Sequence, residues 1–256
     1  MKTVSDPAYY SSLAPFRELF ARGLPILTYH KLGPRPRGTR MKGLCLGKKL
    51  FAEQMAELRA AGFTSQSLDE SLPRGGNPNR RFVITFDDGF VNVLTHALEP
   101  LAANGFRAIQ FIVADRIGQV DEWNRADGEI LSLLMDAAQI KNWLAAGHQI
   151  GSHTLTHPHL TRLPLAQARE EIIASKKKLE DLFGVAVNHF CYPYGDWDER
   201  MRDLVLAAGY RTACTTNFGV NTSETPPGAL LRITARYPTR NLRTLAGKLA
   251  DYFRGK

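Results

Sequence analysis

Cysteine is scarce in this 256-residue chain, which contains only Cys45, Cys191 and Cys214. Their positions form no CxxC pair and no other spacing typical of a metal site. Their odd number argues against a framework of disulfide bonds. The scarcity of cysteine therefore predicts a protein that works in a reducing setting.

Long hydrophobic runs are also lacking. Residues 1–23 carry Asp6, Arg17, Glu18 and Arg22 among their apolar residues, so they show no uninterrupted apolar core of a secretory signal. No segment is long and apolar enough to suggest a transmembrane helix. We therefore expect a cytoplasmic protein, with an exported form whose signal has been trimmed as the alternative. Peripheral contact with a membrane face is compatible with both.

Acidic residues are missing from residues 31–49, which carry seven cations: Lys31, Arg35, Arg37, Arg40, Lys42, Lys48 and Lys49. Glycine and proline residues mark this segment as a loop. It follows the carboxyl end of an expected strand, the end at which active sites of α/β barrels gather. A solvated loop is the usual interpretation of a basic run, and attraction of an anionic substrate is the alternative. A nucleic-acid partner is not expected.

The residues that are present centre on a pair of adjacent acids. The apolar run from Phe82 to Phe86 predicts a buried strand, which ends at Asp87, Asp88 and Gly89. Neighbouring side chains of a strand point to opposite faces, but a glycine permits a sharp turn that lets both carboxylates converge. The simpler interpretation is a cap for the following helix, and it accounts for only one of the two acids.

A second motif, residues 151–158, contains His153 and His157. Pro158 disfavours a helix at His157, so we place the pair on a loop that leaves a strand. Such a loop can still close on one metal ion, because two histidines and one carboxylate are a common ligand set for a divalent catalytic ion. A single histidine would more simply be a surface or core residue.

Helix and strand patterns alternate along the chain. Helices are predicted at 50–61, 91–104, 136–146 and 165–183, each followed by a glycine, and strands at 25–30, 82–86, 108–113 and 149–152. This alternation predicts an α/β fold, with a mostly parallel sheet and helices outside it. With 44% hydrophobic residues, the chain can bury one substantial core, so we expect one main domain.

The periodic pattern weakens between Asp115 and Leu134, which predicts a long loop. Trp123 in this loop has two interpretations. It is either an aromatic platform for the apolar face of a sugar ring or an ordinary packed tryptophan.

Three motifs resemble, in order and rough spacing, those of the polysaccharide deacetylases with a NodB-homology domain, carbohydrate esterase family 4. They are Thr-Phe-Asp-Asp-Gly at 85–89, His-Thr-Leu-Thr-His at 153–157 and Tyr-Pro-Tyr-Gly at 192–195. The resemblance implies a catalytic domain at 25–256, folded as a distorted (β/α) barrel, after an N-terminal helical lead at 1–24. It also implies roles for five residues: Asp87 as general base, Asp88, His153 and His157 as metal ligands, and the Tyr194 backbone N–H in oxyanion binding.

The chain departs from this family's pattern at two positions. Cys191 stands where many members have an arginine that orients the catalytic carboxylate. We predict that Arg232 replaces it and lies within salt-bridge reach of Asp87, with a surface arginine as the alternative. Ile233 occupies the place of the histidine that supplies the general acid. His30, at the end of the first predicted strand, is then the candidate acid, and repeated proton transfer by Asp87 is the alternative.

The resemblance implies a metal-dependent hydrolase that removes N-acetyl groups from an amino-sugar glycan, with Asp87 taking a proton from water. Zinc is the expected ion from the ligand types, and cobalt, nickel, manganese and iron also suit them. A cytoplasmic deacetylase would meet lipid-linked or nucleotide-linked glycan precursors, whose phosphates suit the basic run. Two alternatives stay open: a deformylase or ureide hydrolase on the same fold, and a carbohydrate-binding barrel without turnover.

Overall fold

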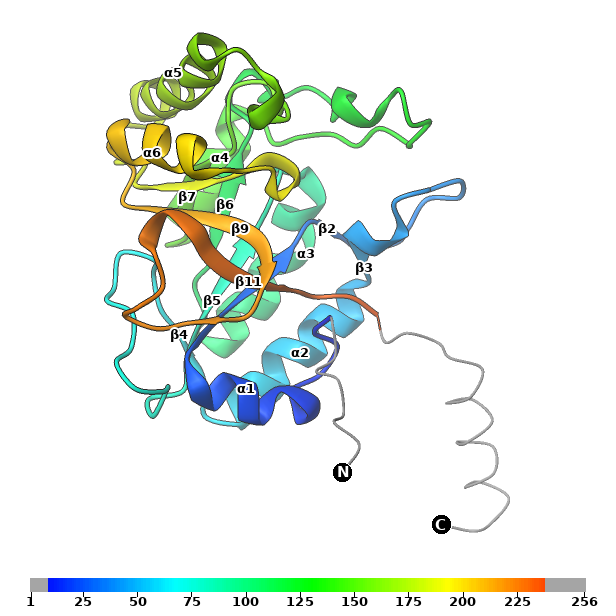
Figure 1. Cartoon of the computed structure of the whole chain (residues 1–256). Coiled ribbons are helices and arrows are strands. Elements are labelled where there is room, and N and C mark those ends of the chain that lie inside the picture. Colours follow the sequence, from blue (N-terminus) through cyan, green and yellow to red (C-terminus); the bar gives the residue numbers. More distant parts are fainter. Residues whose placement is uncertain (1–8, 238–256) are drawn as a thin grey trace.

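The apolar runs predicted as strands lie side by side in the computed structural model, which describes residues 9–237 (Figure 1). Within this range seven parallel strands form a barrel: β1 (Leu24–Tyr29), β5 (Arg81–Phe86), β6 (Ile109–Ile112), β7 (Gln149–Ser152), β8 (His189–Cys191), β9 (Thr212–Phe218) and β11 (Leu230–Thr234). Their order is β1-β11-β9-β8-β7-β6-β5, and β5 pairs with β1, so the sheet closes on itself. The predicted (β/α) barrel of mostly parallel strands is confirmed.

Four short strands of the described chain lie outside the seven-stranded barrel. β10 (Val220–Asn221) pairs antiparallel with β1, and β4 (Thr64–Ser65) pairs parallel with β5. β2 (Lys31–Leu32) and β3 (Cys45–Leu46) form a separate two-stranded sheet. β10 and β4 thus pair with the first residues of β1 and β5, at the amino ends of these strands.

The two faces of the barrel strands bury different sets of apolar side chains, because successive residues of a strand point in opposite directions. Ile26, Val83, Phe111, Cys191 and Cys214 belong to one buried cluster, which fills the inside of the barrel. Residues on the outer face pack against the helices in a larger cluster. All three cysteines are buried and none forms a disulfide bond.

Six α-helices of the described chain cover the barrel: α1 (Arg17–Arg22), α2 (Lys48–Ala60), α3 (Val91–Asn104), α4 (Ala137–Ala145), α5 (Leu165–Phe183) and α6 (Glu199–Ala207). The predicted bounds of α3 and α5 are confirmed, and both helices end at a glycine in the left-handed region. α4 begins with a capping box between Asp136 and Gln139. In α2, Phe51, Met55 and Leu58 are buried, each contributing about 1.5–3 kcal/mol of hydrophobic stabilisation.

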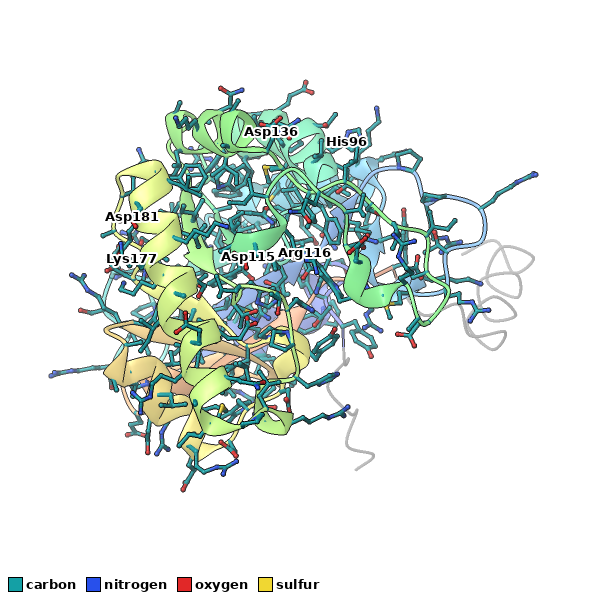
Figure 2. The ribbon with its side chains drawn as sticks, turned by 90° about the horizontal axis from the view of Figure 1, so that it is seen from above. His96, Asp115, Arg116, Asp136, Lys177 and Asp181 are labelled. Carbon is teal, nitrogen blue, oxygen red and sulfur yellow. The ribbon has the colours of Figure 1, made fainter. Side chains whose placement is uncertain are left out.

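Seven short 3-10 helices of the described chain lie in the connections: η1 (Ala14–Phe16), η2 (Lys42–Leu44), η3 (Ala114–Arg116), η4 (Glu122–Asn124), η5 (Leu160–Arg162), η6 (Pro193–Gly195) and η7 (Pro227–Ala229). The predicted loop between Asp115 and Leu134 is thus irregular except for η4 and the end of η3. Seen from above, the labelled Asp115 and Arg116 mark the point where this loop leaves the barrel (Figure 2). Lys178 of α5 forms an ion pair of 2.9 Å with Asp115 there.

Two loops project from the barrel together and form what we name the arm, residues 33–44 and 115–134 (Figure 1, blue and green). The carboxylate of Glu129 joins them, because its Oε2 accepts the backbone N–H groups of Arg40 at 2.8 Å and Met41 at 2.6 Å. At the base of the arm, Lys31 Nζ lies 2.9 Å from Asp121 Oδ2, and both side chains are buried. The arm is therefore held by two buried carboxylates.

The prediction of one solvated basic loop over 31–49 is wrong at both of its ends. Lys31 is 6% exposed, because it lies in β2 and its charge is neutralised by Asp121. Lys48 and Lys49 begin α2 instead of belonging to the loop. The exposed cations that remain on the arm's first loop are Arg35, Arg37, Arg40 and Lys42.

The described residues before β1 pack onto the barrel. Tyr10, Leu13, Phe16 and Phe20 are buried in the same cluster as the helices, and the Tyr10 N–H donates to the carbonyl of Thr234 in β11. Residues 1–8 of the predicted helical lead and 238–256 of the predicted catalytic domain lie outside the described residues. Among residues 9–237, we find no helix with the length and apolarity needed to cross a membrane.

Candidate metal centre and catalytic site

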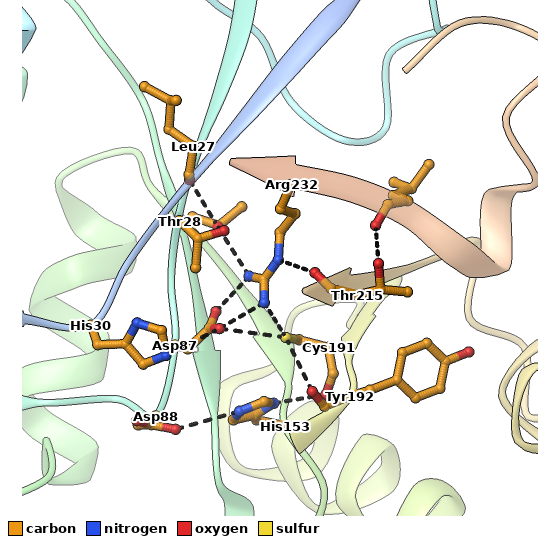
Figure 3. A network of polar contacts seen from close by, with 12 residues as sticks. Leu27, Thr28, His30, Asp87, Asp88, His153, Cys191, Tyr192, Thr215 and Arg232 are labelled. Atoms are coloured by element: carbon orange, nitrogen blue, oxygen red, sulfur yellow. Dashed lines mark hydrogen bonds and ion pairs between the residues drawn. The ribbon is translucent and has the colours of Figure 1, made fainter. Parts of the chain in front are cut away.

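The carboxyl ends of the barrel strands bring together most of the polar residues singled out in the sequence. Asp87 and Asp88 follow β5, His153 follows β7, His30 follows β1, and Arg232 lies within β11 (Figure 3). Parallel strands place their carboxyl ends at one face of a barrel, so residues distant in the chain meet there. This face is the candidate site.

Asp88, His153 and His157 form a compact, buried group suited to a metal ion. Asp88 Oδ1 lies 3.4 Å from His153 Nε2 and 3.3 Å from His157 Nε2. Two ligands placed about 2.0–2.1 Å from one ion at the tetrahedral angle would be about 3.3–3.4 Å apart. The two spacings are therefore short enough for the three side chains to share one divalent ion.

The protonation of the three residues differs, and it bears on metal binding. Burial raises the pKa of Asp88, but its contacts with His153 and His157 outweigh burial and hold that pKa well below the ordinary value. Burial lowers the pKa of His157 to about 4. His153 directs Nδ1 at the carbonyl oxygen of Cys191, 2.7 Å away, so Nδ1 carries a hydrogen. Burial lowers the pKa of His153, but its contacts with Cys191 and Asp88 outweigh burial and hold that pKa well above the ordinary value, so a metal ion at Nε2 would take the place of a proton.

Asp87 is paired with Arg232 and lies beside the ligand group. Arg232 Nη1 donates to Asp87 Oδ1 and Nη2 to Oδ2, both at 2.8 Å, a bidentate geometry between side chains that are 2% and 3% exposed. Burial raises the pKa of Asp87, but Arg232 and then His30 bring it below the ordinary value. Arg232 thus lies within salt-bridge reach of Asp87, and its role in catalysis stays a prediction.

The Cys191 side chain contacts both partners of this ion pair. Its Sγ accepts an N–H from Arg232 Nη2 at 3.1 Å and lies 3.7 Å from Asp87 Oδ2. Burial raises the pKa of Cys191 to about 11, so the thiol stays neutral. Asp87, His153 and Cys191 form a second group with ligand spacing, but the guanidinium cation beside two of its members disfavours a metal ion there.

His30 is the imidazole beside Asp87. Its Nε2 lies 3.7 Å from Asp87 Oδ2, and its side chain is 18% exposed. Burial lowers the pKa of His30, although Asp87 and Asp88 act in the opposite direction. At 3.7 Å His30 lies beyond hydrogen-bond distance of Asp87, and its lowered pKa favours the neutral imidazole, so its role as the acid stays a prediction.

Backbone strain gathers at this site. Asp88, Thr154, His157 and Tyr194 have φ values between 59° and 74°, and they are four of the five non-glycine residues with positive φ in the described chain. Such conformations are uncommon and persist where the surrounding structure over-determines them, often at functional sites. The Tyr194 ring meets the edge of the His157 ring at 4.5 Å between centroids, so the third sequence motif adjoins the metal-ligand group.

Two features of this region could not be predicted from the sequence. Asp121 sits among polar loop residues, where burial is not expected, yet it is 0% exposed against Lys31. Thr85 Oγ1 accepts an N–H from Arg232 Nη1 at 3.2 Å, although its place in an apolar strand suggested packing alone. Both contacts join residues at least 90 positions apart, which no local pattern encodes.

Comparison with known proteins agrees with this geometry. The family model for polysaccharide deacetylases matches residues 74–213 of the chain. YxkH of Bacillus subtilis, a protein assigned as a polysaccharide deacetylase, is 26% identical over 90% of this chain and 74% of its own length. The peptidoglycan-N-acetylglucosamine deacetylase PgdA of Listeria monocytogenes is 27% identical over 50% of this chain and 24% of its own length.

A solved structure has the same fold. The Streptococcus pyogenes deacetylase PplD, in complex with acetate, superposes with a TM-score of 0.71 over 88% of this chain and 97% of its own. Its sequence is 19% identical, so the likeness concerns the fold alone.

Proposed function

The chain belongs to the polysaccharide deacetylase family, and from this premise we propose that it is a metal-dependent N-deacetylase of amino-sugar glycans. Asp88, His153 and His157 would hold the ion. A divalent ion at this position would polarise the acetamide carbonyl and lower the pKa of a water molecule. Zinc suits the two nitrogens and one carboxylate, and cobalt, nickel, manganese or iron are compatible with them.

Asp87 acts as the general base in this proposal. Its carboxylate is ionised at neutral pH, and the bidentate contact with Arg232 fixes its orientation, so it is ready to accept the proton of the attacking water. The backbone N–H of Tyr194, beside His157, would donate to the developing oxyanion. The leaving amine then takes a proton from Asp87 or from His30, which lies 3.7 Å from Asp87.

The observation that carries this proposal is the pair of adjacent but separately held carboxylates. Asp88 faces two imidazoles, and Asp87 faces a guanidinium. A site that merely stored a metal ion would have no use for a second buried, oriented acid. This division of roles favours turnover over the alternative of a carbohydrate-binding barrel.

We further propose that the substrate bears phosphate, as lipid-linked and nucleotide-linked glycan precursors do. The support is the first loop of the arm, which carries four exposed cations and follows the carboxyl end of β1, the end at which His30 lies. Exposed cations raise the local concentration of an anion. Lys31, which is buried against Asp121, takes no part in this attraction.

Acetate release tests the proposed function. The protein, loaded with zinc or cobalt, is incubated with N-acetylglucosamine oligomers, and acetate and formate are measured with and without a chelator. We expect acetate that disappears with the chelator. Formate from N-formyl substrates with no acetate would support the deformylase alternative, and absence of both products with retained glycan binding would support the non-catalytic barrel.

A further inference from the structure

The two histidines of the candidate metal group are oriented in different ways. His153 directs Nδ1 at the Cys191 carbonyl oxygen at 2.7 Å. His157 Nδ1 is buried and has no hydrogen-bond partner within residues 9–237. A ligating histidine usually donates its second ring N–H to a carboxylate, carbonyl or water, which fixes the direction of the ring. Something else must therefore fix His157.

Two aromatic rings hold the His157 ring. Trp123 stacks on it, with ring centroids 4.3 Å apart and planes 24° from parallel. Tyr194 meets its edge at 4.5 Å with planes 67° apart. The His157 backbone is fixed as well, because its N–H donates to Thr154 Oγ1 at 3.0 Å. A stacked ring prevents rotation of the imidazole out of its plane, which is what a hydrogen bond achieves at His153.

Trp123 is itself held in place by the arm. It lies in η4, between the exposed Glu122 and the buried Asn124, and two residues after Asp121. Asp121 is 0% exposed, and its carboxylate accepts from Lys31 Nζ and from the backbone N–H of Ser132. These contacts anchor the turn that carries the indole. The contacts of Asp121 therefore hold the turn that carries Trp123, and its indole can keep a constant position against His157.

We propose that Trp123 is a positioning residue for the metal ligand His157, and that the arm supports the metal centre through it. This inference rests on the proposed function, because it assumes that Asp88, His153 and His157 bind a metal ion. It assigns the loop tryptophan to the ligand shell instead of to the sugar. The stacked geometry uses one indole face for His157, so that face is closed to a substrate.

Metal affinity gives the first test, measured by competition between the apo-protein and a chromophoric chelator for zinc. Loss of a group that orients a ligand typically weakens metal binding about 10–100-fold, and we expect about 10-fold for Trp123→Leu. Trp123→Phe keeps a planar ring and should stay within about 3-fold of the parent protein. Trp197→Phe is the matched control, because Trp197 stacks on Tyr192 instead of a ligand, and it should leave zinc affinity unchanged.

Fluorescence gives a second readout that a general loss of stability would not reproduce. Cobalt bound by His157 would quench the indole stacked on it, so Trp123→Phe should remove most of the cobalt-dependent quenching that Trp197→Phe retains. Thermal unfolding of each apo-variant checks that the fold is intact. If Trp123→Leu proves unfolded, Trp123→Met, which also lacks a ring, takes its place in the zinc competition, and parent-like affinity of that folded variant would overturn the inference.

The outcomes separate this inference from the proposed function. A parent protein that binds no zinc would contradict the metal site and, with it, the role of Trp123. Zinc binding by the parent with equal affinity in a folded Trp123→Leu variant would overturn the inference and leave the metal site intact. The same conclusion would follow if Trp123→Phe weakened zinc binding as much as Trp123→Leu, because a ring would then have no advantage.

Discussion

Replacing Arg232 by leucine should have two linked effects, on stability and on the pH dependence of activity. The guanidinium donates to Asp87 through both terminal nitrogens, and its Nε donates to the carbonyl of Thr215 at 2.7 Å. Leucine fills part of the volume and makes none of these bonds. Asp87 would stay buried, with His30 and the Cys191 thiol as its remaining side-chain neighbours at 3.7 Å in the described chain.

The size of the effect follows from burial. Removing one partner of a buried ion pair costs about 3–5 kcal/mol, because the other charge is left without compensation. Burial is the largest influence on the pKa of Asp87 and raises it, so without Arg232 that pKa should move above its ordinary value. A raised carboxyl pKa destabilises the folded state at neutral pH. The deficit should therefore shrink as the pH falls through the raised pKa, the opposite of the parent, in which Asp87 adds stability above its depressed pKa.

Chemical denaturation and rate measurements between pH 4 and 8 would test this expectation. The acid limb of the kcat/KM profile should move to higher pH in Arg232→Leu. In an Asp87→Asn background the same change should destabilise less, with a coupling energy of roughly 1–3 kcal/mol. Arg211→Leu, which removes an exposed pair with Asp69, is the control and should lose less than about 1 kcal/mol. Additive losses together with an unmoved acid limb would refute the reasoning.

Three further changes probe other parts of the account. His153→Ala should leave the metal site largely empty by elemental analysis, and near-full occupancy would exclude it as a ligand. Replacing Arg35, Arg37 and Arg40 by alanine should slow turnover of a phosphate-bearing glycan at low salt and spare a neutral one. Low salt is needed because exposed charges are screened over about 10 Å at 0.1 M ionic strength. Equal rates of parent and variant on both substrates would make the loop a plain solvated surface. Burial, and then Arg107, lowers the pKa of His148 to about 4. The contribution of neutral His148 to stability is therefore complete above about pH 6.5 and falls as the pH drops. His148→Asn should reduce that loss by roughly 1–3 kcal/mol in acid denaturation, and an unchanged dependence of the unfolding free energy on pH would contradict this.

Local patterns predicted the elements that local physics determines. The strand ending at Asp87 and the helices α3 and α5 were predictable, because a short apolar run, an amphipathic period and a terminal glycine all act within a few residues. α6 (Glu199–Ala207) was not predicted. It is nine residues long, Asp198 caps its first turn by accepting the Met201 N–H, and Met201, Leu204 and Val205 form its buried face. These local signals were present in the sequence, but a helix this short is marginal by itself and depends on packing as well.

At the candidate site, too, contacts between residues far apart in the chain could not be predicted from local patterns. The two motifs around Asp88 and His153 indicated a metal group, since few other roles suit those residue types together. The burial of Lys31 could not be foreseen, because its partner Asp121 lies 90 positions away and a lone lysine is normally solvated. The support of His157 by Trp123 likewise joins two loops whose relative placement depends on the closed barrel. Long-range pairs of this kind become visible when the strand order is known.

The most direct test of the central claim is Asp87→Asn, measured as acetate release from an N-acetylated amino-sugar glycan alongside the metal content of the same sample. The change keeps the shape of the side chain and removes its ability to accept a proton. We predict full metal content and a rate lower by roughly 10²–10⁴-fold, the usual contribution of general acid–base catalysis. Near-normal acetate release by the metal-loaded variant would contradict the assignment of Asp87 as the base.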